Sequence, residues 1–462
     1  MDKLAQLRLR FLPWVIAIAM FMDTLDSTIV GVAIPSIANS FGINPVNMKL
    51  ALTSYLLSLA IFIPISGWLA DRYGEKRIFL IAMVVFTLSS IACALSRNLD
   101  MLILFRLIQG FGGALMMPVG RLIILRTYPR EDYVKAMGSV ILPGMIGPAL
   151  GPTIGGIILH ITTWHWIFMI NVPVGIIGVI IGWFLIPDST QITRPPPFSW
   201  TGFILFSLGL SMVTFAMAIL GDNFEWSEYA LILGGVATLL LLMYAHVSKK
   251  QKYPLFNLNL FKQPTFFSAM VISFISRIGT GAMPFLLPLL LQILWGKSPL
   301  YSGIVFIFMA AGMMSTRVFI NQKLLHRYGY RRLLIIDIVL LTIISMNLCW
   351  FSTPKPIFLL YITVFFIGVL TSQLYMSLGT LYPAHLNESE YSQGTSIAST
   401  IQQFSMGCGV AIAAISLHLI AKLMHIPMLT ASVFFWTFVV LNTIGLTSLF
   451  FVMQLDKEVG KQ

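Results

Sequence analysis

Two acidic residues, Asp23 and Asp26, lie three positions apart inside an apolar stretch that covers residues 12–36. On a helix this spacing places both carboxylates on one face. Ionisable side chains within a bilayer are costly and usually face water or a charged partner. Two carboxylates this close oppose being ionised together, and removal from water acts in the same direction. We therefore predict that Asp26 exchanges a proton near neutral pH. For Asp23 we give proton exchange and simple contact with water equal weight.

A basic residue, Arg106, lies inside another apolar stretch, residues 99–125, and Asp26 is our candidate for its counter-charge. A buried cation favours the ionised form of a carboxylate partner, and separation of the two favours protonation. A conformational change that parts them would therefore drive proton uptake and release. The alternative is that Asp26 only anchors Arg106 and that Asp23 only faces water.

The elements that must hold these residues are membrane spans. Hydrophobic residues make up 57% of the 462 positions and charged residues 10%, whereas soluble domains have roughly 45–50% and about 25%. Apolar stretches that reach or approach the roughly 20 residues needed to cross a bilayer predict transmembrane helices. We predict fourteen of them, at residues 12–36, 48–71, 77–96, 99–125, 133–160, 165–187, 199–219, 228–247, 266–293, 300–324, 332–351, 356–382, 393–421 and 429–453.

The net charge of +12 is a topology signal in this chain. An even number of spans puts both termini on one side, and we count 21 Lys and Arg residues there, five on the other side and three within spans. An excess of Lys and Arg is typical of cytoplasmic loops. We therefore expect a multi-pass protein of the cytoplasmic (inner) membrane with both termini in the cytoplasm, and no nucleic-acid partner.

An internal repeat divides the chain. The segment Arg72–Arg77 recurs as Arg327–Arg332, each time in a predicted turn after a span. Parallel halves of this kind form two-bundle transporters, with a substrate site at their interface. The repeat predicts a six-helix bundle over residues 1–190, a linker with two extra helices over 191–262 and a second six-helix bundle over 263–462.

Glycine and proline are concentrated in the predicted fifth span. Five glycines and two prolines occur between residues 144 and 156, a composition that predicts a bent helix with a closely packed neighbour. These residues are Gly144, Gly147, Pro148, Gly151, Pro152, Gly155 and Gly156.

Three further polar residues within spans are candidates for a substrate cavity: Arg277, Gln109 and Asn171. Arg277 precedes a proline-broken helix, which favours a cation facing an anionic cargo group. Two alternatives remain open, namely a structural pair with Asp337 or hydrogen bonds to backbone carbonyls.

The turn after the second span carries Asp71, Arg72 and Arg77 around Gly74. Positive-inside topology explains the arginines but not Asp71, because acidic residues contribute little to orientation. A carboxylate at this place can receive a helix N-terminus or an arginine from another span and lock one state of the bundle. We predict a gating role, with a simple topological role as the alternative.

Five segments together resemble the fourteen-helix drug:proton antiporters of the major facilitator superfamily. They are Leu25–Pro35, Gly67–Arg77, Arg106–Gly110, Gly144–Gly156 and Trp164–Gly175. Glu75 stands where the family's loop motif usually has a basic residue. His165, Met116–Arg121 and Ser276–Gly281 resemble one multidrug-transporter subfamily in particular.

The resemblance implies an all-α integral membrane protein of the major facilitator fold, with two six-helix bundles and two inserted helices. It implies export of small amphipathic compounds in exchange for protons by alternating access. In that reading Asp26 and Arg106 couple the proton, Gly67 to Arg77 form a gating loop, and the glycines and prolines of residues 144–156 allow bending.

We expect no metal, no cofactor and no enzymatic activity, and a monomer whose partners are the lipid bilayer, protons and a small-molecule substrate. The first alternative is efflux of an anionic metabolite or siderophore-like chelate, suggested by Arg277. A channel or a membrane-embedded enzyme is a further alternative, but the sequence offers no catalytic cluster of suitable spacing.

Overall fold

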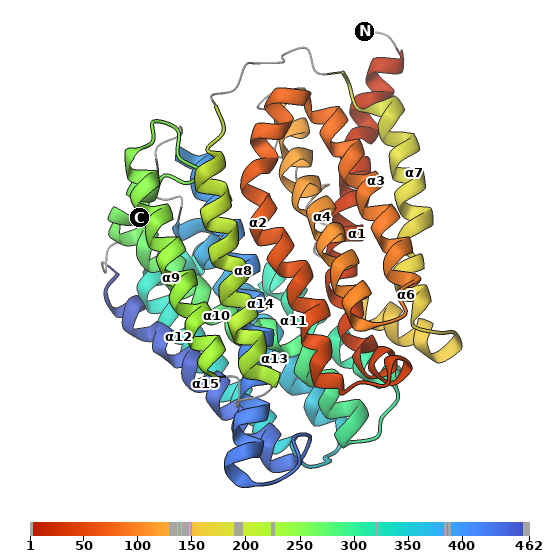
Figure 1. Cartoon of the computed structure of the whole chain (residues 1–462), viewed down its shortest axis with the longest axis vertical. Helices are drawn as coiled ribbons and strands as arrows, with labels where there is room; N and C mark the ends of the chain where they lie inside the picture. Colours follow the sequence, from red (N-terminus) through yellow and green to blue (C-terminus); the bar gives the residue numbers. More distant parts are fainter. Residues whose placement is uncertain are drawn as a thin grey trace.

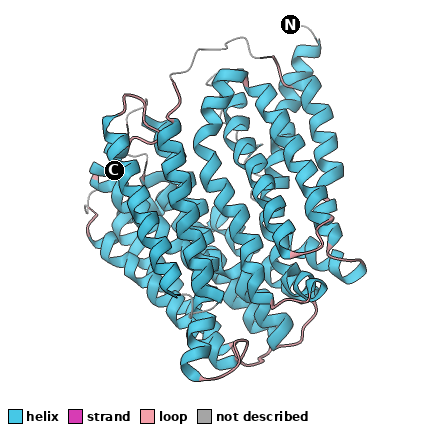
Figure 2. Cartoon of the chain, viewed as in Figure 1, coloured by secondary structure: helices cyan, strands magenta, loops and turns pink. Residues whose placement is uncertain are grey.

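The computed structural model describes residues 3–128, 136, 140, 147, 150–188, 197–222, 227–319, 322–382, 386 and 390–455. This part of the chain is helical and contains no strand, as Figure 2 shows. Thirteen of its helices are long and apolar enough to cross a membrane, and the apolar helix Leu150–Ile161 is shorter. These helices overlap the predicted spans and in several places extend beyond them, although most of residues 133–149 of the fifth span lie outside the described residues.

The first half of the chain contains the six spans predicted there, as far as it is described. Its helices are α1 (Lys3–Phe41), the short η1 (Pro45–Met48), α2 (Lys49–Tyr73), α3 (Glu75–Ala94), α4 (Leu99–Thr127), the helix Leu150–Ile161, and α6 (His165–Met169) with α7 (Asn171–Leu185), which together form one span.

The inserted pair and the helices of the second half come next in the chain. The inserted pair is α8 (Trp200–Asp222) and α9 (Ser227–Lys250), followed by the short η3 (Leu258–Lys262). The second half contains α10 (Pro264–Pro288), which continues into the π-helical turn η4 (Leu289–Leu294), then α11 (Pro299–Phe319), α12 (Gln322–Trp350), α13 (Ile357–Leu381), α14 (Tyr391–Met424) and α15 (Ala431–Met453).

Successive spans run in opposite directions, so the start of α1 and the end of α15 lie on the same side of the bundle (Figure 1). We call this side the terminal face and the other side the opposite face. The turn around residue 74, residues 186–188 and 197–199, and the segment 251–263 lie at the terminal face. The turns around residues 42–48, 95–98 and 295–298 lie at the opposite face.

Glycines with positive φ mark the internal repeat in the structure. Gly74 separates α2 from α3 with φ 88°, and Gly329 bends α12 with φ 71°. Residues with a side chain rarely adopt this conformation, because their Cβ crowds the backbone. The two copies of the repeated turn therefore share a backbone feature as well as a sequence.

The inserted pair covers the line along which the two halves meet. Helix α8 packs against α9, against α2 of the first half and against α14 of the second half. Figure 1 shows α8 directly beside α2. The insertion is therefore in contact with both bundles.

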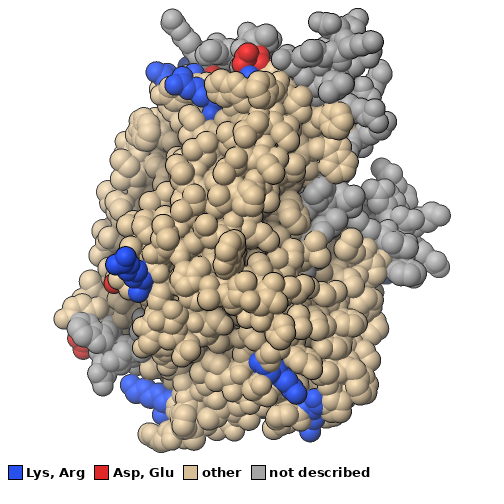
Figure 3. All heavy atoms as spheres, turned by 90° about the vertical axis from the view of Figure 1, so that its right-hand side faces the viewer, with Lys and Arg blue, Asp and Glu red and all other residues tan. Residues whose placement is uncertain are grey.

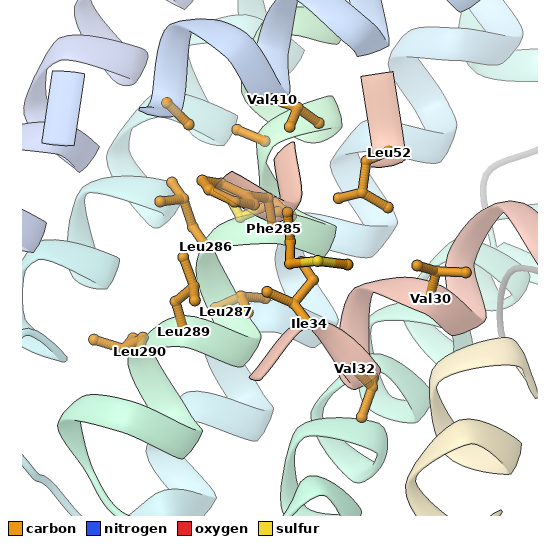
Figure 4. Packing of buried hydrophobic residues seen from close by; sticks show 14 of the residues in the cluster. Val30, Val32, Ile34, Leu52, Phe285, Leu286, Leu287, Leu289, Leu290 and Val410 are labelled. Atoms are coloured by element: carbon orange, nitrogen blue, oxygen red, sulfur yellow. The ribbon is translucent and has the colours of Figure 1, made fainter. Parts of the chain in front are cut away.

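A large apolar cluster joins the two halves toward the opposite face. Val30 and Ile34 of α1 pack there with Phe285 and Leu286 of α10, and Val410 of α14 belongs to the same cluster (Figure 4). In water, burial of apolar side chains stabilises such contacts by roughly 25 cal/mol per Å². Within a membrane, close packing of the side chains stabilises them instead. The halves are thus firmly packed on this side.

The outer surface suits a lipid environment. Figure 3 shows a broad face on which few Lys, Arg, Asp or Glu side chains interrupt uncharged residues. Large apolar side chains are exposed on the spans, for example Ile180, Phe184 and Leu242. This pattern is expected for helices that face hydrocarbon.

Candidate functional site

Asp26 of α1 is fully buried and accepts hydrogen bonds from three side chains of the first half. Arg106 of α4 donates from Nη1 to Asp26 Oδ2 and forms an ion pair with it. Gln109 Nε2 donates to Asp26 Oδ1 at 3.0 Å, and Asn171 Nδ2 donates to the same oxygen at 2.7 Å. Because α1, α4 and α7 each contribute, their relative positions determine whether this network is complete.

The arginine of this pair is buried and contacts three further residues of α2 and α4. Arg106 is 1% exposed, its Nη1 donates to Gln109 Oε1 at 2.7 Å and its Nε contacts the Ala51 carbonyl oxygen at 3.4 Å. Its guanidinium lies 4.1 Å from the ring centroid of Tyr55, a cation–π contact. The predicted pairing of Asp26 with Arg106 is therefore present in the structure.

Gln109 and Asn171 are placed differently from the cavity position that we predicted for them. Gln109 is 0% and Asn171 2% exposed. Both side chains bind Asp26, and Gln109 also donates to Ser90 Oγ at 2.8 Å. Neither is among the residues that line the cavity described below. Their amide groups satisfy a buried carboxylate, a need that outweighs exposure to the cavity.

Asp23 lies one helical turn from Asp26 and has a different environment. Its carboxylate accepts a hydrogen bond from the Tyr55 hydroxyl and lines a cavity. A Cβ added at Gly113 of α4 would lie 2.5 Å from Asp23 Oδ1, so the absence of a side chain at this glycine makes room for the carboxylate. The sequence places both acids on one helical face, but their surroundings differ. Asp26 is buried away from the cavity, and Asp23 faces the cavity.

The cavity has a volume of about 1240 Å³ and lies between the two halves. It extends from Asp23 to residues at the terminal face, among them Asp71, Tyr253 and Glu390. The first half contributes mainly apolar residues of α2 and α4. The second half contributes a polar strip of α14, including Ser399, Gln402 and Gln403. A volume of this order is large enough for a drug-sized molecule.

On the opposite face the halves are closed by direct contacts. Gln292 Nε2 donates to the Val32 carbonyl oxygen at 2.9 Å, which connects η4 to α1. Thr153 Oγ1 donates to the Gly303 carbonyl oxygen at 3.2 Å, which connects the helix Leu150–Ile161 to α11. The two halves are therefore separated toward the terminal face and in direct contact toward the opposite face.

The glycines of the fifth span form two packing seams. A Cβ added at Gly147, Gly151 or Gly155 would come within 2.8 Å of an atom of α1. A Cβ added at Gly156 would lie 2.9 Å from the backbone of Leu300 in α11. The same helix therefore touches α1 within the first half and α11 across the interface.

Pro152 takes part in the second seam, because a Cβ added at Gly303 would lie 2.6 Å from the Pro152 carbonyl oxygen. The remaining members of the predicted motif, Gly144 and Pro148, lie outside the described residues.

Asp71 at the predicted gating turn is paired within the first half. Arg126 at the end of α4 donates from Nη2 to Asp71 Oδ1 at 2.6 Å and from Nη1 to Glu75 Oε2 at 3.1 Å. The carboxylate thus receives an arginine from another span, as predicted. That span belongs to the same half, so this pair does not connect the two bundles in the present conformation.

The other members of the turn have separate surroundings. The guanidinium of Arg72 lies 5.5 Å from the ring centroid of Trp68, and Arg77 is exposed. Gly67 lines the cavity and Gly74 supplies the positive φ at the turn.

Arg277 of α10 is 8% exposed and is not among the cavity-lining residues. Its guanidinium lies 3.7 Å from the ring centroid of Tyr375, and its Nε donates to Ser273 Oγ at 3.2 Å. Among the described residues no ion pair joins it to Asp337. Arg277 is stabilised by an aromatic ring and a hydroxyl, an arrangement that sequence reasoning did not anticipate.

Two residues of the site escaped sequence analysis. Tyr55 contacts both Asp23 and Arg106, but a tyrosine in an apolar stretch looks like an ordinary core residue. Arg126 binds Asp71 from a helix end, where a basic residue is already explained by topology. The pattern of charges offered no signal that would have selected either one.

Comparison with known proteins agrees with this architecture. The sequence model of the Major Facilitator Superfamily matches residues 16–410. A protein of Salmonella newport (strain SL254) named "Putative multidrug resistance protein MdtD" is 41% identical over 403 residues, which cover 87% of this chain and 84% of that protein. The protein of the same name from Salmonella typhi has the same identity and coverage.

Solved structures share the fold at low sequence identity. A bacterial homologue of the human lysosomal transporter Spinster is 14% identical with a TM-score of 0.67, covering 98% of this chain and 97% of that chain. An auto-inhibited peptide transporter of the POT family is 13% identical with a TM-score of 0.68, covering 97% of each chain. At such identity the likeness concerns the arrangement of the helices alone.

Proposed function

The chain belongs to the major facilitator superfamily, and on that premise we propose that it exports small amphipathic compounds from the cytoplasm in exchange for protons. The observation that carries this proposal is the buried pair of Asp26 and Arg106 beside a cavity that reaches one face of the molecule. The name of the Salmonella relatives supports drugs as the class of cargo.

Proton coupling is assigned to Asp26. Its carboxylate has three side-chain donors on α4 and α7. A movement of α1 against these helices removes donors and allows the carboxylate to take up a proton. The glycine seam between α1 and the helix Leu150–Ile161 supports such a movement, because small residues permit helices to slide at close distance.

Alternating access is supported by the unequal packing of the two faces. The cavity reaches the terminal face, while apolar contacts and hydrogen bonds join the halves at the opposite face. We assign the terminal face to the cytoplasm from the excess of Lys and Arg on that side. The present conformation then receives cargo from the cytoplasm, and rocking of the halves would expose it on the other side of the membrane.

A gate is assigned to the turn with Asp71. In this conformation Arg126 holds the carboxylate within the first half. Closure of the terminal face would bring this turn toward the second half, where an exchange of partners would lock the closed state. We further propose that a monomer suffices, because a single chain provides the cavity and the acid beside it.

Efflux of an anionic compound was the alternative suggested by Arg277. That alternative requires the guanidinium to face the cargo, whereas in this conformation it lies against Tyr375 away from the cavity. The geometry therefore favours amphipathic cargo over anionic cargo.

The decisive experiment is transport by Asp26→Asn in proteoliposomes with an imposed pH difference. We expect proton-driven export to be lost, because the amide cannot take up and release the proton, while solute counterflow without a pH difference persists. Asp100→Asn is the matched control, because Asp100 lies exposed on α4 away from the pair. Export against a gradient by Asp26→Asn would contradict the assignment.

A further inference from the structure

The insertion forms a large part of the cavity mouth. Of the 35 described residues that line the cavity, 13 belong to residues 191–262. They come from two places, the residues just before α8 and the segment from the end of α9 to η3, and include Phe198, Lys252 and Tyr253. The two additional helices are therefore positioned to act on whatever enters the cavity.

Aromatic rings converge where this insertion meets α2. The ring centroids of Trp68 and Phe198 are 5.2 Å apart, and Phe198 and Trp200 are 5.0 Å apart. Phe198 also lies 5.7 Å from Phe203, which continues the cluster along α8. Trp68 and Phe198 both line the cavity and are only partly buried.

A second aromatic cluster on the same insertion shows what rings look like when they serve packing alone. Phe206 lies 5.4 Å from Tyr244 and 5.2 Å from Phe256, measured between ring centroids. Tyr244 and Phe256 are buried, and none of these three residues lines the cavity. The rings at Trp68 and Phe198 differ because they are partly open to the cavity.

The Trp68 ring is also held in place before any ligand arrives. The Arg72 guanidinium lies 5.5 Å from its centroid, and the Phe198 ring packs against it with a tilt of 43°. A ring that is already oriented loses little conformational freedom on binding, which favours affinity. Aromatic rings attract other aromatic rings in offset or edge-to-face arrangements.

We propose that Trp68 and Phe198 form a subsite at the cavity mouth that binds the planar aromatic part of a transported compound. The inference rests on the proposed function for the identity of the cavity as a cargo site, and it adds the chemical class of the group that is recognised. It also gives the inserted helices a role, because Phe198 belongs to the segment that leads into α8.

The test is equilibrium dialysis of the purified full-length protein in detergent with three probes. Ethidium and pyrenesulfonate are planar and aromatic with opposite charges, and tetrabutylammonium has no ring. The variants are Trp68→Leu and Phe198→Leu, with Trp68→Phe as the conservative variant. Phe206→Leu is the matched control, because it removes a ring of the insertion that does not line the cavity.

We expect each of the Trp68→Leu and Phe198→Leu variants to bind at least one planar probe roughly three- to tenfold more weakly, the contribution of one aromatic pair. Trp68→Phe and Phe206→Leu should bind it as the natural chain does, and tetrabutylammonium binding should not change. Unchanged binding of both planar probes by both leucine variants would overturn the subsite. The same conclusion would follow if Phe206→Leu lost as much affinity, or if the natural chain bound neither planar probe.

The binding experiment separates this inference from the proposed function. Ring-dependent binding without export driven by a pH difference would leave the subsite standing and overturn proton-coupled export. Export driven by a pH difference with ring-independent binding would do the reverse.

Discussion

The two halves of the molecule bury the same kinds of charged side chain in different surroundings. In the first half, Asp26 and Arg106 are 0% and 1% exposed and form an ion pair with further amide donors. In the second half, Arg277 rests on the Tyr375 ring. Asp337 is 3% exposed, and its Oδ2 has no hydrogen-bond partner among the described residues.

The difference shows how a repeated architecture can divide its tasks. An acid and a base in direct contact can change partners when helices move, so the first half is suited to couple a proton to motion. In the part of the chain that the structure describes, Arg277 forms no ion pair with an acid that it could exchange. Apart from Glu390 at the terminal face, the second half presents neutral hydrogen-bonding groups to the cavity, such as Gln402 and Gln403 of α14. This contrast supports our proposal that proton chemistry belongs to the first half and that both halves contact the cargo.

The largest effect is expected when the pair in the first half is broken. Arg106→Met leaves the Asp26 carboxylate buried without its counter-charge, which should lower the free energy of unfolding by about 3–5 kcal/mol. Thermal unfolding of the purified protein in detergent measures the loss. The double variant Asp26→Asn with Arg106→Met removes both charges and should recover most of the stability but no proton-driven export. If Arg106→Met is as stable as the natural chain, the ion pair does not stabilise the fold. The contrast drawn between the two halves would then be wrong.

A smaller effect is expected from adding one methyl group in each half. Gly151→Ala places a Cβ 2.2 Å from Thr28 Oγ1 and 2.9 Å from the Leu25 carbonyl oxygen, so α1 must shift. Overpacking of this kind costs about 1–3 kcal/mol. At Gly279 in α10 an added Cβ meets no heavy atom within 4 Å. Gly279→Ala should therefore change stability by less than about 1 kcal/mol in either direction.

Transport assays sharpen the same contrast between the two glycines. Gly151→Ala should slow export more than it reduces ligand binding, because the glycine lies at the seam along which α1 would move. Gly279→Ala should leave the export rate near that of the natural chain. Equal rates for the two variants would show that this seam does not limit the movement of the halves.

The arrangement of the fold could be predicted from the sequence because membrane spans have strong physical signatures. Apolar length located the spans, and both copies of the repeated turn have a glycine at positive φ in the structure. The pairing of Asp26 with Arg106 could also be predicted, because a buried carboxylate and a buried arginine need each other. These predictions depend on composition and on the cost of burying charge, which a single sequence displays.

The roles of uncharged residues could not be predicted in the same way. Gln109 and Asn171 looked like cavity residues, yet both donate to Asp26. An amide within a span must find a partner, but the sequence does not say whether this partner is cargo or protein. Tyr375 gave no signal at all, because its contact with Arg277 depends on how α10 and α13 pack. The packing of the helices determines which partner such a side chain finds.

The smallest effect is expected from removing the charge in the second half. Arg277→Met eliminates a cation–π contact worth about 0.5–2 kcal/mol, but it also removes the cost of burying a cation without a carboxylate. These two contributions oppose each other, so stability should change by less than about 1 kcal/mol, in contrast to Arg106→Met. Proton-driven export should persist, measured in proteoliposomes with the same imposed pH difference. A loss as complete as that of Asp26→Asn would mean that both halves couple the proton. A loss confined to anionic compounds would mean that Arg277 meets the cargo in another conformation, since the same guanidinium lies against Tyr375 in this one.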